Sequence, residues 1–260
     1  MLDCPEIKKA LKTDDDLLSE QALRDISKSW TDCANRLTGS GIDINGYTIM
    51  EVIEDLEAAR TALGYERINL LSESYGTRVA YLYGVKHPDS IHRSAMIGVN
   101  PPGRLHWEPA TIDAQLWGPL SLASWPVKPI PEEYRKMQHS DVQTLLISGS
   151  VDFSTPAEFA TKELLPYLRN GHQVILSEIG HVNDVWKIIP ATTERLLTSF
   201  YNTGVPNTSL ATYTAMDFNV KWGFPTTAKA LLGIMVVAAV IIAGLAWLLI
   251  STRQLIDMLI

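Results

Sequence analysis

Residues 68–88 read INLLSESYGTRVAYLYGVKHP, and this stretch decides the fold class. Ile68 to Leu71 form an apolar run too short for a helix, so they predict a buried strand. The small and polar residues Ser72 to Gly76 predict a tight turn. The residues after it predict a helix that ends before Pro88, because a proline disfavours helical backbone in the residue before it. The pattern is strand, tight turn, helix.

The sequence on both sides extends this pattern. Upstream, residues 48–64 place apolar side chains at helical spacing, with Thr48 and Glu51 as a capping box and Gly64 as an end signal. Strands that alternate with helices imply an α/β fold, in which a mainly parallel sheet is covered by helices on both faces. The further predicted elements are a helix at Glu20–Leu37, strands at Ser94–Val99, Val142–Ser148 and Gln173–Ser177, and a helix at Pro156–Leu168.

Ser74 stands in the middle of the predicted turn, in the segment SESYGT, which approximates the pattern G-x-S-x-G. Such a turn lifts a nucleophilic serine clear of the sheet in a strained conformation and needs small neighbours; Ser72 replaces the first glycine, which a small side chain can tolerate. The next helix points its N-terminus at the developing oxyanion, which makes the Tyr75 amide a candidate donor. A polar turn with two serines is common, so its place between strand and helix is what favours a nucleophile.

A serine hydroxyl is a weak nucleophile and needs a base, which in turn needs a group that holds it. Asp152 follows the predicted strand VQTLLIS, and His181 follows the predicted strand QVILS. Alone, Asp152 would equally be a turn or helix-capping residue, and His181 a surface-loop residue. The chain order and the position after strands fit a triad at the carboxyl edge of a sheet. Ser74, Asp152 and His181 are therefore the predicted catalytic residues.

Five segments carry a family resemblance: LDCPE at 2–6, DLEAARTALGYERINLLSESYGTRVAYLYGVKHPDSIHR at 55–93, GVNPPG at 98–103, SGSVDFSTP at 148–156 and GHVND at 180–184. Over most of residues 1–204 the chain resembles α/β-hydrolases related to the tripeptidyl aminopeptidases and proline iminopeptidases. The resemblance implies an α/β-hydrolase fold with Ser74 as nucleophile, Asp152 as acid and His181 as base. It also implies that the substrate is the N-terminal region of a peptide.

Two features depart from the resemblance. Relatives carry a long helical cap, whereas only about 40 residues, 100–140, intervene here, and SWPVKP near Trp125 resembles the far end of that cap. The family's first strands and its His-Gly-Gly type loop, which supplies an oxyanion donor, normally precede the sequence that begins at Met1. Only the Tyr75 amide is identifiable as a donor, and losing one donor costs about 3 to 4 kcal/mol of transition-state stabilisation.

From this departure we expect a longer natural protein, with a signal sequence, further strands and a Gly-rich loop ahead of Met1. Residues 1–47 are charged and show no apolar β run. The sheet formed by the present residues should therefore have four strands, with Ile68–Leu71 at an exposed edge. We expect the chain as given to be nearly inactive and poorly soluble.

Residues 230–250 read ALLGIMVVAAVIIAGLAWLLI, without a charge. As a helix this segment would be about 31 Å long, against about 30 Å of hydrocarbon in a bilayer, so it predicts one transmembrane helix. A buried core helix would normally show a polar face. The expected organisation is a partial α/β-hydrolase domain at 1–203, a juxtamembrane linker at 204–229, the transmembrane helix at 230–250 and a short tail at 251–260.

The basic residues on the two sides of the predicted transmembrane helix are too evenly distributed to set its orientation in the membrane. Cys4 and Cys33 either form one disulfide or are two buried thiols. The anchor allows an oxidising compartment, and secreted members of the resembled family pair cysteines near these positions, which favours the disulfide. We therefore expect a single-pass membrane protein whose hydrolase domain lies outside the cytoplasm.

Other classes of partner find little support in the sequence. The net charge of −7 leaves no basic stripe for nucleic acid, and the histidines and cysteines lack metal-site spacing, so we expect no nucleic acid, metal or cofactor. Glu73 either attracts a substrate amine or packs on neighbouring loops. Asn207, in the sequon Asn-Thr-Ser, is either a glycan acceptor or an unmodified linker residue.

The sequence thus predicts a membrane-anchored serine hydrolase that cleaves near the N-terminus of peptides through an acyl-enzyme. Its expected partners are a peptide or small acyl substrate and a lipid bilayer. Two alternatives stay open: an esterase of the same fold, and a catalytically impaired, membrane-tethered remnant that acts as a binding protein.

Overall fold

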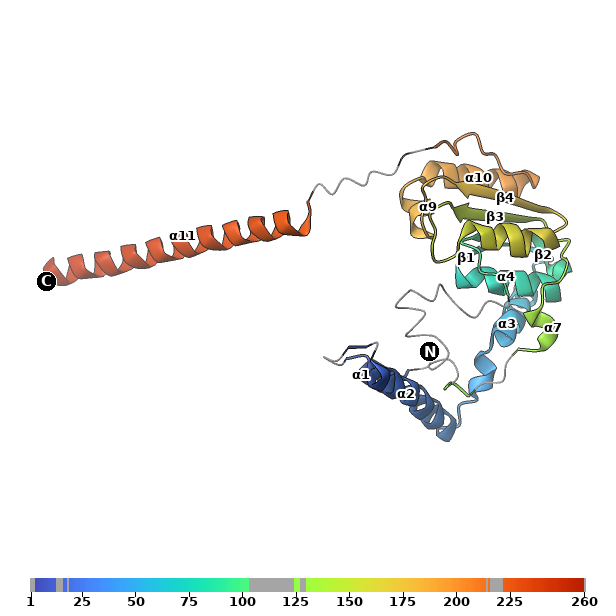
Figure 1. The fold of residues 1–260 in the computed structure, drawn as a ribbon, viewed down its shortest axis with the longest axis horizontal. Helices are drawn as coiled ribbons and strands as arrows, with labels where there is room; N and C mark the ends of the chain where they lie inside the picture. The colour runs from blue at the N-terminus through green and yellow to red at the C-terminus, as the bar shows by residue number, and fades with distance from the viewer. Residues whose placement is uncertain are drawn as a thin grey trace. The chain divides into compact units, whose positions relative to one another are not determined.

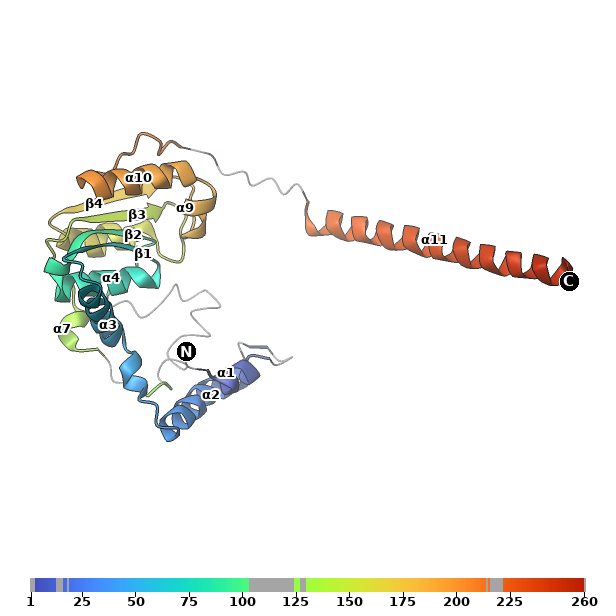
Figure 2. The ribbon, with the colours of Figure 1, turned by 180° about the vertical axis from the view of Figure 1, so that it is seen from behind.

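The computed structural model describes residues 3–12, 16–17, 19–102, 124–126, 130–213, 215 and 222–259 (Figures 1 and 2). The chain divides into two compact units, Met1–Ala215 and Met216–Ile260. Most of the region expected to hold the shortened cap, including His106, lies outside the described residues.

The described part of the first unit contains one sheet of four parallel strands in the order β1-β2-β3-β4. The register pairs Leu71 with Ala95 and Ile97 with Ile147. The predicted parallel sheet is confirmed, with strand ends shifted by a few residues. The strands are β1 (Ile68–Glu73), β2 (Ile91–Ile97), β3 (Thr144–Gly149) and β4 (Gly171–Leu176).

Helices cover both faces of this sheet, as predicted (Figure 1). On one face, α3 (Ile49–Ala62), α4 (Tyr75–Lys86) and the helical segment 157–167 pack against side chains that include Met96 and Leu146. On the other face, α9 (Asn183–Lys187) and α10 (Pro190–Thr203) cover the alternate side chains of the strands. Successive strand residues point to opposite faces, so both sets are buried. The second set includes Ala95, Ile97, Leu145 and Ile147.

Local signals explain the helix that precedes β1. The Thr48 hydroxyl accepts from the Glu51 amide (3.4 Å), which satisfies one of the free donors at the start of α3. The helix ends at Ala62, and Gly64, two residues later, has a φ of 74°. The predicted boundaries of this helix are therefore confirmed to within two residues.

The helix predicted at Pro156–Leu168 is irregular. It consists of a short α-helical turn, α8 (Ala157–Phe159), then a π turn (Ala160–Leu164) and a 3-10 turn (Leu165–Tyr167). Pro166 lies in the last turn and has no amide hydrogen to continue an α-helical ladder. The hydrogen-bond pattern therefore changes before the segment ends. The short helix α7 (Glu132–Arg135) lies upstream of β3.

Strand β1 lies at one edge of the sheet, as predicted. Its side chains alternate between partly buried and exposed, and Leu71 is 51% exposed. A mainly apolar groove of about 480 Å³ runs along this strand, between it and helices α3 and α4. An edge strand with exposed apolar side chains can pair with another chain.

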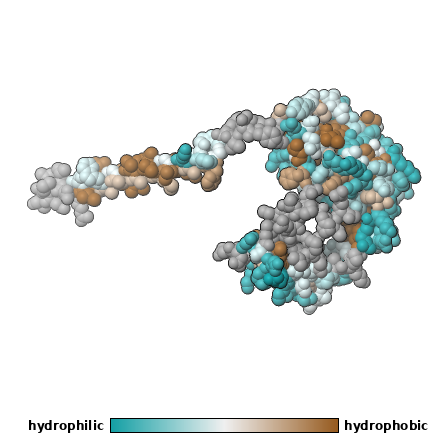
Figure 3. Space-filling view, in the orientation of Figure 1, coloured by the Kyte–Doolittle hydropathy of each residue, from teal (hydrophilic) through white to brown (hydrophobic). Residues whose placement is uncertain are grey.

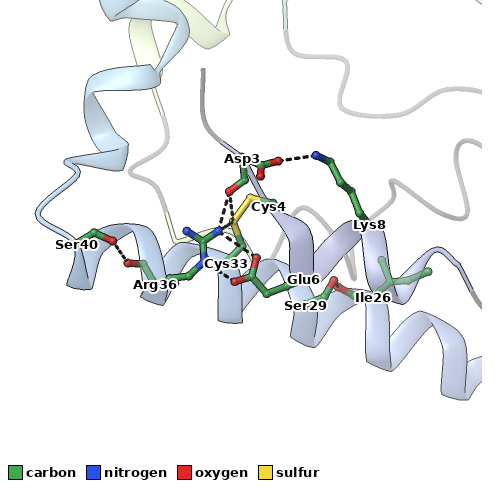
Figure 4. Close-up of a disulfide and its surroundings, with 9 residues drawn as sticks. All are labelled: Asp3, Cys4, Glu6, Lys8, Ile26, Ser29, Cys33, Arg36 and Ser40. Carbon is green, nitrogen blue, oxygen red and sulfur yellow. Dashed lines mark hydrogen bonds and ion pairs between the residues drawn. A yellow bond between two sulfur atoms is a disulfide. The ribbon is translucent and has the colours of Figure 1, made fainter.

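The first residues form a helical hairpin that a disulfide closes (Figure 4). Helix α1 (Pro5–Ala10) packs on α2 (Glu20–Gly39), and Cys4 is bonded to Cys33 with a Cα–Cα distance of 5.5 Å. Arg36 reinforces the pair, because its guanidinium donates to the Glu6 carboxylate. Of the two alternatives for the cysteines, the structure has the disulfide.

The second unit is dominated by one apolar helix, α11 (Phe224–Leu259). Residues Phe224–Leu248 are long and apolar enough to cross a membrane, with a mean hydropathy of 2.7 and no buried side chains. Figure 3 shows the corresponding run of hydrophobic surface. The helix begins at Phe224, so residues 224–229, which we expected in the linker, are helical.

Candidate active site

Ser74 occupies the junction between β1 and α4. Its backbone angles are φ 48° and ψ −120°, a conformation that non-glycine residues rarely adopt. Its amide donates to the Ile97 carbonyl oxygen (2.9 Å), and its own carbonyl oxygen accepts from the Thr77 amide (3.0 Å) and hydroxyl (2.6 Å). Backbone strain of this kind persists only where surrounding contacts hold it. The turn thus has the strained geometry that the sequence pattern predicts.

The small residues around the turn fit together without strain of their own. A Cβ added to Gly76 would lie 3.8 Å from the Ser72 Cβ, an ordinary van der Waals contact. The Ser72 hydroxyl donates to the Ala95 carbonyl oxygen (3.3 Å) on β2. Serine is therefore accommodated where the G-x-S-x-G pattern has its first glycine.

Asp152 and His181 form a hydrogen-bonded pair. Asp152 is 4% exposed, and its Oδ2 lies 2.8 Å from His181 Nδ1. The other oxygen, Oδ1, accepts from the amides of Ser154 and Thr155 (2.9 Å each). The Thr155 hydroxyl donates to Oδ2 (2.8 Å) and lies 3.2 Å from His181 Nδ1. Both carboxylate oxygens are thus fully engaged.

These contacts decide the charge of the pair. Burial raises the pKa of Asp152, but the hydrogen bonds from His181 and Thr155 outweigh it and hold that pKa below its usual value. Asp152 is therefore a carboxylate near neutral pH, and a carboxylate can only accept hydrogen bonds. The proton between the two residues must then sit on His181 Nδ1. Nε2 is then the ring nitrogen that can accept a further proton.

The ring of His181 packs on Gly98, the residue that follows β2. A Cβ added to Gly98 would lie 2.9 Å from His181 Cε1 and 3.1 Å from the Thr155 hydroxyl oxygen, and its φ is 64°. The loop that carries His181 passes close to Gly149, at the end of β3. A Cβ added to Gly149 would lie only 2.0 Å from the Ile179 carbonyl oxygen, so a side chain there would block this approach. Glycines at these two positions let His181 approach the end of β2.

This packing brings His181 toward Ser74. The Ser74 amide is bonded to Ile97, and His181 Cε1 lies over the next residue, Gly98. Cε1 separates the two ring nitrogens, so the free Nε2 is beside the same strand end. Within the described residues no direct hydrogen bond joins the two side chains. In many enzymes this bond tightens only when substrate is present.

Tyr75 is the first residue of α4, so its amide has no acceptor within that helix. The helix dipole adds partial positive charge at the same place. The Tyr75 amide can therefore donate to an oxyanion formed beside Ser74. Its side chain is 57% exposed.

Arg78, one turn into α4, is a residue near the site that the sequence did not single out. Its guanidinium donates to the Asn100 side chain (2.7 Å) and to the Pro101 carbonyl oxygen (3.1 Å). The Asn100 amide in turn donates to the Thr77 hydroxyl (2.9 Å). These bonds tie the segment after β2 to the turn at Ser74. The only sequence signal is an arginine one turn after a candidate nucleophile.

Glu73 contacts a neighbouring element, which was one of its two predicted roles. Its carboxylate accepts a hydrogen bond from the Trp186 indole in α9. Trp186 follows His181 by five residues. The contact thus links the end of β1 to the helix that follows the histidine loop.

Three potential metal-ligand atoms, on Cys4, Glu6 and Cys33, lie within 4.8 Å of one another. Both sulfur atoms are joined in the disulfide. A metal is bound by thiolates, which a disulfide does not provide. This group therefore does not have the donor set of a metal site.

Two family profiles match the chain in overlapping stretches. The α/β hydrolase fold matches residues 25–148, and the TAP-like protein family matches residues 108–198. The chain has the α/β-hydrolase fold. Together the two matches include Ser74, Asp152 and His181.

Among curated proteins, this α/β-hydrolase is similar to tripeptidyl aminopeptidases from Streptomyces lividans and Streptomyces coelicolor. Each is 32% identical over 117 residues, which is 43% of this chain and 21% of the relative. The match thus spans about a fifth of the length of these relatives.

Solved structures of low sequence identity are similar to parts of the chain. An α/β hydrolase from a Medee basin deep-sea metagenome library has a TM-score of 0.47 and 18% identity, covering 69% of this chain and 77% of that one. A meta-cleavage product hydrolase from Pseudomonas fluorescens has a TM-score of 0.46 and 13% identity, covering 61% and 73%.

Proposed function

We propose that this α/β-hydrolase is a membrane-anchored serine hydrolase in which Ser74 is the nucleophile, His181 the base and Asp152 the residue that orients it. One observation carries the proposal: the Asp152–His181 pair packs on Gly98, directly after the residue that binds the Ser74 amide. The proposal combines a strained serine, an imidazole held by a carboxylate and a helix N-terminus near one edge of the sheet. This is the arrangement that acyl transfer through a serine requires.

The chemistry follows from these atoms. His181 Nε2 accepts the Ser74 hydroxyl proton as Oγ bonds to the substrate carbonyl carbon, and the Tyr75 amide donates to the resulting oxyanion. The bond to the leaving group breaks, and His181 returns the proton to that group. Water then hydrolyses the acyl-enzyme by the same proton route. Asp152 stabilises the imidazolium in both steps without being protonated.

Similarity to tripeptidyl aminopeptidases favours peptides with a free N-terminus as substrates. The test compares hydrolysis of a tripeptide anilide that has a free amine with the same compound acetylated at its N-terminus, using the full chain in detergent. An aminopeptidase prefers the free amine by a large factor. Equal rates on both compounds, or hydrolysis of simple acyl esters alone, would favour the esterase alternative.

We propose that α11 anchors the protein by spanning a bilayer once. Residues 224–248 are predominantly apolar, residues 230–248 carry no charge, and none of them is buried against other parts of the chain. An alkaline carbonate wash should therefore leave the full chain in membranes, and removal of residues 224–260 should release it. Release of the intact chain by carbonate would contradict a spanning helix.

A catalytically impaired, membrane-tethered interaction protein is the second candidate. The observation that favours it is the open edge of β1, with its apolar groove between α3 and α4. Such an edge can bind an extended segment of a partner. A folded chain that hydrolyses none of the peptides and esters above, yet binds a specific partner, would establish this candidate.

A further inference from the structure

Asn207 lies just beyond the first unit's last helix and is held there by the fold. Helix α10 ends at Thr203, and Gly204 turns the chain with a φ of 81°. The Asn207 amide then donates to the Ser199 hydroxyl (2.7 Å) on α10. This bond fixes the backbone of the sequon Asn-Thr-Ser against the last turns of the helix.

The side-chain amide of Asn207 is arranged so that its nitrogen is free. Its oxygen accepts from the Ser209 amide (3.0 Å), which forms a local turn across the sequon. In the described part of the chain, no hydrogen bond uses Asn207 Nδ2, and the residue is exposed. The fold therefore leaves room for a substituent on this nitrogen.

A surface groove borders Asn207. It has a volume of about 430 Å³ and borders Asn207, with Glu194, Arg195 and Thr198 of α10 among its lining residues. These side chains offer both donors and acceptors to the hydroxyl and acetamide groups of a sugar. A first sugar attached at Asn207 would thus have polar partners in this groove, beside the apolar side chains of Ala191 and Leu210.

The cellular compartment of the hydrolase unit can be inferred from its disulfide and from the apolar helix that follows the unit. The Cys4–Cys33 disulfide requires an oxidising environment, and α11 supplies an apolar segment of membrane-spanning length. Secretory compartments that oxidise thiols are also those that attach N-linked glycans. Asn207 begins the only Asn-x-Ser/Thr sequon in the 260 residues.

We propose that Asn207 carries an N-linked glycan, so that the hydrolase unit faces the exterior or lumen and the residues after α11 face the cytoplasm. In the transfer, Asn207 Nδ2 bonds to the anomeric carbon of an N-acetylglucosamine in a lipid-linked oligosaccharide diphosphate. The bond from that carbon to the diphosphate breaks, and the amide nitrogen loses one proton. The lipid diphosphate leaves, and no electrons are exchanged with an oxidant or reductant.

The direct test uses protein isolated from its native membranes. Digestion with a peptide N-glycosidase should increase its gel mobility and convert the residue at position 207 to aspartate, which mass spectrometry of the peptide reads. Recovery of that peptide with an unmodified asparagine from the native protein would overturn the proposal. This measurement needs no variant, so it does not depend on how a substitution affects folding.

Matched variants then locate the modification. Asn207→Gln and Ser209→Ala should each give the mobility of digested wild type, whereas Ser209→Thr and Thr208→Ala retain a sequon and should migrate as wild type. A shift that persists in Asn207→Gln would place the glycan elsewhere and contradict the proposal. None of these residues touches Ser74 or His181, so hydrolysis should be unchanged in all four. Loss of the glycan and failure of the proposed hydrolysis are thus separate outcomes.

Discussion

His181 Nδ1 lies 2.8 Å from Asp152 Oδ2, and the same oxygen accepts a second hydrogen bond of 2.8 Å from Thr155. Since Asp152 is ionised, both partners must be donors. The pair therefore has a defined proton arrangement before substrate arrives. Thr155 is a positioning residue, because it acts on His181 through the carboxylate.

Removing the Thr155 hydroxyl should weaken this arrangement. In Thr155→Val we expect kcat to fall about tenfold with little change in KM, because a hydrogen bond to a charged group is worth about 1.5 kcal/mol or more. The pKa of Asp152 should rise, since one of the bonds that lowers it is gone. Steady-state kinetics and infrared titration of the carboxyl band measure the two effects. Thr155→Ser keeps the hydroxyl and should behave as wild type; equal losses in both variants would argue against this role.

Gly98 should tolerate no side chain. In Gly98→Ala the new Cβ would lie 2.9 Å from His181 Cε1, and the φ of 64° is unfavourable for alanine by about 1 to 2 kcal/mol. We expect activity to fall by more than the stability loss explains, because the imidazole must move. Thermal melting and kcat/KM give the comparison. Gly39→Ala, in a site with open space around the Cβ, is the control. Full activity in Gly98→Ala would mean that the ring does not act from this position.

The carboxylate of Glu57 should make stability depend on pH. It accepts from Tyr83 (2.7 Å) and Arg60 (2.7 and 2.9 Å), and these bonds lower its pKa from 4.5 to about 2. A lowered folded pKa contributes stability that is complete above the unfolded value, about 4.5, and lost as pH falls toward about 2. Glu57→Gln should lose this slope and should be less stable near neutral pH by about 1 to 3 kcal/mol.

Urea unfolding at several pH values measures the effect of Glu57. Glu158→Gln, at an exposed glutamate, is the control and should keep the wild-type pH dependence. If the free energy of unfolding of Glu57→Gln depended on pH as strongly as that of wild type, the Glu57 carboxylate would not be the source of the pH dependence.

Leu71 should promote self-association through the open edge of β1. It is 51% exposed on an edge strand, and natural edge strands use lysine to block pairing with other chains. Leu71→Lys should reduce association of the full chain in detergent without changing its melting temperature. Val205→Lys replaces another exposed apolar residue away from the sheet and should have no such effect. Similar association in wild type and Leu71→Lys, measured by chemical cross-linking, would exclude this edge as the contact.

The sequence predicted those parts that depend on local signals. The capping residue Thr48 and the strand, turn and helix around Ser74 are read from neighbours in the chain, and the structure confirms them. The positions of Ser74, Asp152 and His181 after the carboxyl ends of three strands predicted that they share one edge of the sheet. The structure places Asp152 against His181 and brings the histidine to the end of β2.

What the sequence did not predict depends on contacts between distant segments. Thr155 reads as an ordinary turn residue until Asp152 and His181 are brought together. The need for glycine at position 98 appears only once the histidine ring lies over it. The π and 3-10 turns at 160–167 are a different case, because Pro166 is a local signal that the predicted regular helix left out.

Covalent labelling of Ser74 would show whether this residue is the nucleophile. A fluorophosphonate reacts with a serine only when a base activates its hydroxyl. The full chain in detergent, shown to be folded by a cooperative melt, is treated with the probe, digested and analysed by mass spectrometry, with Ser74→Ala as control and an active serine hydrolase as reference. We expect adduct on the Ser74 peptide of wild type and none on any peptide of Ser74→Ala. A folded wild-type chain that stays unlabelled while the reference reacts would contradict this expectation.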